Sequence, residues 1–138
     1  MALIDASDAT HARLRERYAE RRDVGYAGFD YRVYGRMRVA DAVRFYGALH
    51  ERWDGAQLAG DLQACGLGPG LEVRRMKTVY QRTLVLALIS AARPALLVVE
   101  RADQFDVPPA AELLERAVRR AAEAVVTYPG AVPLDGAP

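Results

Sequence analysis

The sequence has little cysteine, little lysine and no long apolar run. Cys65 is the only cysteine, so the chain can form no internal disulfide, which suits a reducing cytoplasm. The longest apolar stretch, residues 84–92, is far shorter than the ~18 residues that a membrane span needs. The first eleven residues hold no basic segment followed by an apolar core. We therefore predict no signal peptide and no direct membrane insertion.

The net charge is also small. With 19 Lys and Arg against 18 Asp and Glu, the formal charge is +1, so no global field attracts nucleic acid or an anionic membrane. His11 and His50 have no Cys or His neighbours at metal-ligand spacing, and we predict that both lie at the surface. Aromatic side chains among arginines could stack nucleobases: Tyr26, Tyr31, Tyr34, Tyr46 and Trp53. No nucleic-acid motif accompanies them, so we predict no such partner.

What the sequence does contain is an alternation of strand and helix patterns. Its 138 residues favour one domain. Residues 2–5 are a short apolar start, residues 6–22 a polar helix or loop, and residues 129–138 a loose tail. Strands are predicted at 23–28, 95–99 and 125–128, and helices at 39–53, 54–66, 76–92 and 106–124. This order predicts an α/β fold with a parallel sheet.

Local signals mark several element ends. Asp54 with Gln57 three residues later is a capping-box pattern, and Gly66 is placed to end that helix in a left-handed turn. Asp106 is a candidate cap for the last helix, whose first turn holds two prolines. The run 95–99 is apolar on both faces, as in a central parallel strand, and Glu100 follows directly.

Most of the chain resembles, in order and spacing, the ATPase subunit of ATP-binding cassette (ABC) transporters. The resemblance is carried by "VGYAGFD", by the segment from "MRVADAV" to "QACGL", by "RRMKTVYQRTLVLALISAARPALLVVERADQFD" and by "EAVVTY". It implies a P-loop-NTPase-like α/β core with a shortened parallel sheet and a helical subdomain at about 37–75. Residues 1–138 would then form a single truncated domain of this kind, with a flexible tail at about 129–138.

The departures from this family fall on the residues that would carry its chemistry. No G-x-x-x-x-G-K-[ST] sequence occurs, although the N–H groups and lysine of such a loop hold the phosphates. The chain would thus start after the place of that loop. Phe29 replaces the family's glutamine, and Tyr128 replaces its switch histidine. In place of the signature Leu-Ser-Gly-Gly-Gln stand Met76, Lys77, Thr78, Val79 and Tyr80.

The end of the acidic strand is altered as well. Glu100 stands where the family has a magnesium-associated aspartate, and Arg101 stands where it has the catalytic glutamate. A guanidinium cannot act as a base. The pair is either a residual metal or nucleotide site, with Glu100 its weak candidate, or a polar strand end with local ion pairs. We favour the second interpretation, and we predict that Phe29 and Tyr128 pack over the vacated nucleotide region rather than form an aromatic ligand platform.

The resemblance also implies an order of strands. The family's phosphate-loop strand and a later strand lie on one side of its sheet. The three predicted strands would then stay adjacent, with 96–99 in the middle, and the shortened side would be a bare edge. Such an edge invites pairing with another chain.

These features predict a non-catalytic ABC-ATPase-like protein that acts as an interaction or regulatory subunit. Its partners would be a second copy, an intact ABC ATPase or a transmembrane subunit, because residues 37–75 match the part that docks against the transmembrane subunit in the family. We predict a cytoplasmic protein, at the membrane only through a partner, with no cofactor and no metal. The alternative is an ATP-binding transporter subunit whose incomplete site a partner completes, and ATP with magnesium is expected only there.

Overall fold

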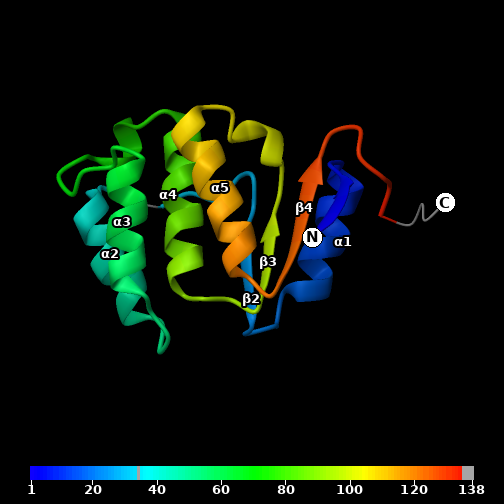
Figure 1. Cartoon of the computed structure of the whole chain (residues 1–138), viewed down its shortest axis with the longest axis horizontal. Helices are drawn as coiled ribbons and strands as arrows, with labels where there is room; N and C mark the ends of the chain where they lie inside the picture. Colours follow the sequence, from blue (N-terminus) through cyan, green and yellow to red (C-terminus); the bar gives the residue numbers. More distant parts are fainter. Residues whose placement is uncertain (34, 135–138) are drawn as a thin grey trace.

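The computed structural model describes residues 1–33 and 35–134. Its centre is a parallel sheet ordered β1-β4-β3-β2, with helices on both faces (Figure 1). The strands are β1 (Ala2–Asp5), β2 (Val24–Ala27), β3 (Leu96–Val99) and β4 (Glu123–Tyr128). The predicted α/β fold class is confirmed. The predicted placement of the strand at 96–99 between its two neighbours is confirmed too.

The sheet has one strand more than the three that were predicted. β1 pairs in parallel with β4, from Ala2 opposite Val125 to Asp5 opposite Tyr128. β1 is as short as β2 and β3, but it is exposed at its start and no glycine follows it as Gly28 follows β2, which is why the pattern missed it. The shortened side of the sheet, which we expected to be a bare edge, is therefore covered by β1, and that expectation is wrong. The edge strands of the sheet are β1 and β2.

Helices cover the sheet unequally. α1 (Asp8–Tyr18) lies on one face, whereas α4 (Thr78–Ala91) and α5 (Pro108–Arg120) cover the other (Figure 1). α2 (Val39–Ala48) and α3 (Gly55–Ala64) pack beyond α4, and the short turns η1 (Val73–Arg75) and η2 (Ala102–Gln104) complete the chain. α2, α3 and η1 fall within residues 37–75, the range predicted as a helical subdomain.

The side chains on the two faces of β3 belong to two different apolar clusters. Leu97 and Val99 join the large cluster that includes α4 and α5, while Leu96 and Val98 join a smaller one around Leu14 of α1. All four β3 side chains are buried. The unbroken apolar run in the sequence is explained by this placement, because a central strand with helices on both faces has no solvent side.

The helix ends follow the local signals only in part. The Asp54 side chain accepts a hydrogen bond from the Gln57 N–H at 2.9 Å, and Gly66 is left-handed with φ +70°. The Gln57 side chain does not close the capping box but donates to Ser90 on α4. The prediction that Asp106 caps α5 is wrong. Val107 holds the cap position, and its side chain makes no capping hydrogen bond. Prolines in the first turn leave fewer N–H groups to cap.

The segment after β4 is hydrogen-bonded back to β1. The Asp5 N–H donates to the Val132 carbonyl at 2.7 Å, and the Gly130 N–H donates to the Asp5 carboxylate at 3.1 Å. The last part of the predicted tail, residues 135–138, lies outside the described residues, as does Tyr34. Within the described part of the chain, no helix combines the length and apolar character of a membrane span.

Candidate functional site

Glu100 lies at the carboxyl end of β3, and its side chain has no exposed surface. The carboxyl ends of parallel strands are where α/β proteins form their ligand sites. The neighbours of this carboxylate therefore decide whether the place can act on a ligand.

Arg15 of α1 binds the Glu100 carboxylate through two parallel hydrogen bonds. Its Nε donates to Oε2 at 2.8 Å and its Nη2 donates to Oε1 at 2.5 Å. The same Nη2 also pairs with the exposed Asp30 at 2.6 Å. Such a fork-to-fork pair is directional as well as charge-assisted, so it fixes the orientation of the carboxyl group.

Two further donors complete the shell of the carboxylate. The Tyr26 hydroxyl donates to Oε2, and the Phe29 N–H donates to Oε1 at 3.1 Å. Each oxygen of Glu100 thus accepts two hydrogen bonds. Burial alone would raise the pKa of Glu100, but the hydrogen bonds from Arg15, Tyr26 and Phe29 outweigh it and hold the pKa below its usual value. The carboxylate is charged and fully engaged by the protein itself.

His11 lies beside this carboxylate, so the prediction that it lies at the surface is wrong. Its side chain is 6% exposed, with Nε2 2.8 Å from the Thr127 hydroxyl and Nδ1 4.0 Å from Oε1 of Glu100. Nδ1 has no hydrogen-bond partner within the described residues. Burial lowers the pKa of His11, so the ring is neutral near pH 7. His50 is exposed, as predicted.

A second arginine holds the chain that follows Glu100. Buried Arg82 of α4 donates to the Glu100 carbonyl at 2.7 Å and to the Arg101 carbonyl at 3.0 Å. Its guanidinium also lies over the Phe105 ring, 4.5 Å from the centroid. Burial lowers the pKa of Arg82 to about 10, which leaves it protonated near pH 7. This contact ties α4 to the end of β3.

Arg101 and Glu100, adjacent in sequence, do not act on each other. Arg101 has a left-handed backbone with φ 53°, and its N–H donates to the Thr127 hydroxyl at 2.8 Å. Its side chain pairs with Asp103 at 2.8 Å. The structure therefore gives the two residues separate partners, with Glu100 inside and Arg101 partly exposed.

The two aromatic residues predicted to pack over this region behave differently. Phe29 is half-buried, and its ring centroid lies 5.5 Å from that of His11 and 5.5 Å from the Arg15 guanidinium. Tyr128 ends β4 with 47% of its surface exposed, so it does not cover the carboxylate. Packing over the site is thus the role of Phe29 alone of the two.

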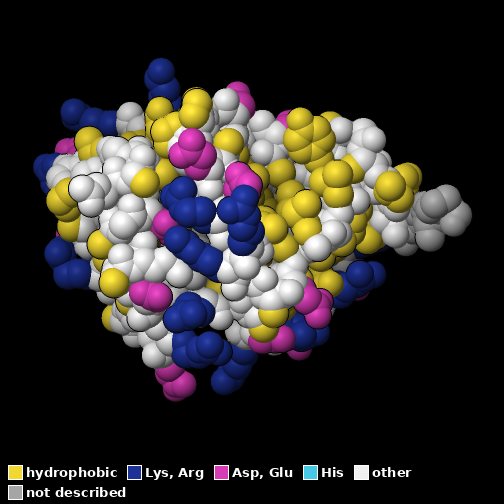
Figure 2. Space-filling view, viewed as in Figure 1, with side chains coloured by type: hydrophobic (Ala, Val, Ile, Leu, Met, Phe, Trp, Pro, Cys, Tyr) yellow, Lys and Arg dark blue, Asp and Glu magenta, His cyan; other side chains and the backbone are white. Residues whose placement is uncertain are grey.

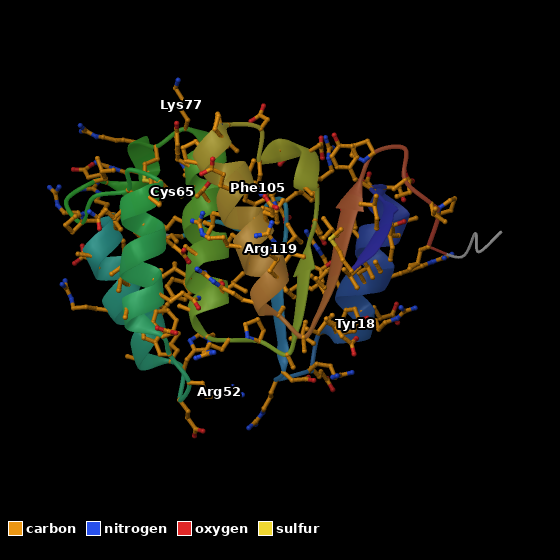
Figure 3. The ribbon with its side chains drawn as sticks, viewed as in Figure 1. Tyr18, Arg52, Cys65, Lys77, Phe105 and Arg119 are labelled. Carbon is orange, nitrogen blue, oxygen red and sulfur yellow. The ribbon has the colours of Figure 1, made fainter. Side chains whose placement is uncertain are left out.

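The segment in the signature position forms the start of α4. Lys77 is the residue before the helix, is exposed, and projects from the top of the molecule (Figure 3). Thr78 to Tyr80 form the first turn, and Val79 lines a small pocket of about 260 Å³ together with Phe29 and Arg82. These residues and Glu100 do not share a hydrogen bond or ion pair in the described part of the chain.

The site does not fit a magnesium–nucleotide complex. Both oxygens of Glu100 are engaged, and the described residues include no group of three or more His, Cys, Asp or Glu side chains that could hold a metal. β1 and α1 are joined by Ala6 and Ser7 alone, and the Ser7 hydroxyl already accepts the Thr10 N–H. With Asp8 in its first turn, the α1 N-terminus offers no free cradle for phosphate.

Sequence reasoning missed the side chains that surround Glu100. Arg15, Tyr26 and Thr127 carry no motif, and they reach the site only through the packing of α1 and the neighbouring strands. A signal was nevertheless present in α1. His11, Leu14, Arg15 and Tyr18 recur at helical spacing, which marks one face of a helix that packs against other elements.

Comparison with known proteins finds likeness in fold. No protein-family model and no curated protein matches the chain. One similar solved structure is an ATP-binding subunit of an ABC transporter, with TM-score 0.68 and 15% identity over 92% of this chain and 67% of that one. Another is cbiO1 from Clostridium perfringens, part of the ABC transporter complex cbiONQ. It has TM-score 0.56 and 14% identity over 91% of this chain and 52% of that one. The fold resembles the ABC ATPase core, and the chain spans about two thirds and about half of these two chains.

Proposed function

We propose that this protein is a non-catalytic member of the ABC ATPase fold that acts as an interaction or regulatory subunit of a transporter or ATPase complex. The observation that carries the proposal is the enclosure of Glu100 by Arg15, Tyr26 and the Phe29 N–H. An acid that binds magnesium needs free oxygen lone pairs. Here Arg15 donates to both oxygens of Glu100, which are the atoms that a metal ion would need.

The connection after β1 supports the same proposal. β1 occupies the side of the sheet where the family has its phosphate-loop strand, and only Ala6 and Ser7 separate it from α1. A phosphate loop works because several successive N–H groups surround the phosphates. A two-residue connection with a capped helix cannot provide them. The proposal is thus that this short connection stands where the family has its phosphate loop.

The proposed partner surface is the helical part of the chain. In the family, the region that residues 37–75 match docks against the transmembrane subunit. At the end of α2, the large apolar side chains of Phe45 and of Leu49, the residue directly after the helix, lie one turn apart and are 49% and 63% exposed. Exposed apolar pairs of this kind are typical of docking surfaces. A transmembrane subunit or an intact ABC ATPase is the proposed partner, and the protein would be cytoplasmic and reach the membrane only through it.

Titration calorimetry with ATP and magnesium tests the loss of nucleotide binding. We expect no saturable heat from the purified chain, because in its described part the α1 N-terminus offers no phosphate cradle and both oxygens of Glu100 are engaged. Micromolar binding that Glu100→Gln abolishes would overturn the proposal and favour the alternative, an ATP-binding subunit with an incomplete site. The variant must first be shown to fold by its circular dichroism spectrum. Affinity purification from the native host, with neighbouring gene products identified, then names the partner.

A further inference from the structure

The open edge of β2 presents unpaired backbone groups. The Asp23 and Ala27 carbonyls accept hydrogen bonds from the Leu96 and Glu100 N–H groups. Strand residues alternate in direction, so the N–H and C=O groups of Val24 and Tyr26 face away from β3. No hydrogen bond to these four groups occurs within the described residues. The edge is therefore a free template for another strand.

A groove of about 530 Å³ runs along this edge. Its walls are apolar side chains of β2, α4 and the neighbouring loops: Val24, Val33, Val85, Leu88, Ile89 and Pro94. Tyr26, Tyr31 and Tyr46 add aromatic surface. A strand laid along β2 would thus find both backbone partners and apolar contacts for its side chains.

The charge of the groove is of one sign. Its charged lining residues are Arg22 and Arg32, and among the described residues no Asp or Glu lines it. Arg32 is already engaged by the Phe29 and Tyr31 carbonyls, whereas no bond from Arg22 is seen within the described residues. Opposite charges across an interface favour association and discriminate between partners. The occupant that complements this lining carries an acidic side chain.

We propose that the β2 edge binds an extended, apolar segment of a partner protein that carries Asp or Glu, and that this segment adds to the sheet as a fifth strand. Main-chain hydrogen bonds to Val24 and Tyr26 provide the pairing, and Arg22 selects for the acid. The inference specifies how the partner of the proposed interaction subunit is bound, and so rests on that role. A helical segment could fill the groove but could not pair with the strand edge.

Peptide selection with a hydrogen-exchange readout tests the proposal. Random octapeptides displayed on phage are selected on the immobilised full chain, and two enriched peptides are synthesised. We expect sequences that alternate apolar and polar residues and contain Asp or Glu. In NMR hydrogen exchange, the bound peptide should slow the Val24 and Tyr26 amides by about tenfold or more. Methylating alternate peptide nitrogens should abolish binding in one of the two frames only.

Two charge-reversal variants, one at the groove and one away from it, test whether the peptide binds at this site or is attracted to any exposed arginine. Arg22→Glu should weaken peptide binding by about tenfold. Arg17→Glu, at an exposed position on α1, should leave it unchanged. The proposal is overturned if no peptide is enriched, if the exchange of Val24 and Tyr26 does not change, or if both methylated frames bind equally. None of these outcomes bears on ATP binding, so failure here and failure of the proposed function are distinguishable.

Discussion

Glu100 owes its charged state to a single arginine and two lesser donors. A carboxylate removed from water is costly unless its charge is paired and its lone pairs are bonded. Arg15 provides the pairing from another element, α1, and its guanidinium is in turn shared with Asp30. The ion pair between Arg15 and Glu100 consequently connects α1 to the end of β3.

Removal of Arg15 should expose that dependence. We expect Arg15→Ala to lower the free energy of unfolding by about 2–3 kcal/mol, because it leaves a buried charge unpaired. Arg17→Ala, at an exposed position on the same helix, should change it by less than about 0.5 kcal/mol. Urea denaturation measures both. Adding Glu100→Gln to Arg15→Ala should recover part of the loss, and equal midpoints for the two single variants would contradict this account.

His11 should make the stability of the protein depend on pH. Burial lowers its pKa in the folded state from the usual 6.5. The unfolded chain therefore binds more protons below that pH, and stability falls as the pH drops from about 7 towards 5. Glu100, Arg15, Asp8 and Arg101 also act on His11. Glu100, with its lowered pKa, loses its own contribution only below 4.5, in a separate range.

The two histidines allow a matched comparison of this effect. His11→Gln should remove the loss of stability between about pH 7 and pH 5. His50→Gln should retain it, because His50 is exposed. Urea midpoints at three pH values in this range provide the measurement. A slope that persists in His11→Gln and disappears in His50→Gln would show that the assignment is wrong.

At the scale of elements, β2 and α4 approach each other closely at one glycine. A Cβ added to Gly25 would lie 2.5 Å from Cγ2 of Ile89 and 2.9 Å from Cγ of Pro94. The ring of Pro94 is rigid, and Ile89 is held within α4. The absence of a side chain at Gly25 is therefore what lets the helix pack against the edge strand.

Substitution of Gly25 should lower the free energy of unfolding, whereas substitution of Gly60, which has free space around it, should raise it. We expect Gly25→Ala to destabilise the protein by about 1–3 kcal/mol through overpacking. Gly60 lies inside α3 with nothing within 4 Å of an added Cβ, and Gly60→Ala should stabilise by about 0.5–1 kcal/mol. Thermal or urea unfolding compares them. The β2–α4 packing described here is wrong if Gly25→Ala is as favourable as Gly60→Ala.

At the scale of the whole molecule, large apolar side chains are exposed at the β1 end of the sheet. Met1, Leu3, Tyr128 and Val132 are 77%, 49%, 47% and 51% exposed. The hydrophobic surface on the right of Figure 2 gathers over β4 and the start of the chain. An apolar patch beside an edge strand is typical of an interface.

The isolated chain should accordingly self-associate. We expect light scattering to show concentration-dependent dimers, and Leu3→Lys to shift the equilibrium to monomers by placing a charge on the edge strand. Leu49→Lys, at a more exposed apolar position directly after α2, should not. A monodisperse monomer at high concentration would contradict the hypothesis that the chain works as a dimer through this edge.

The sequence by itself determined the features that depend on neighbours along the chain. The run 95–99 indicated a strand with helices on both faces, and Asp54 and Gly66 marked the two ends of α3. Strand and helix periodicities arise from local backbone geometry, so they can be identified from consecutive residues. The same reasoning missed β1, which is exposed at its start and is not followed by a glycine.

Only the tertiary structure decided the chemistry of the site. Glu100 was identified as an acid at a strand end, but Arg15 lies 85 residues away, and His11 meets Thr127 across 116 residues. No local pattern records which side chains an approaching helix brings to a buried charge. The packing of α1 against the sheet places an arginine on that acid. For this reason the fold class could be predicted from the sequence, whereas the enclosed state of Glu100 could not.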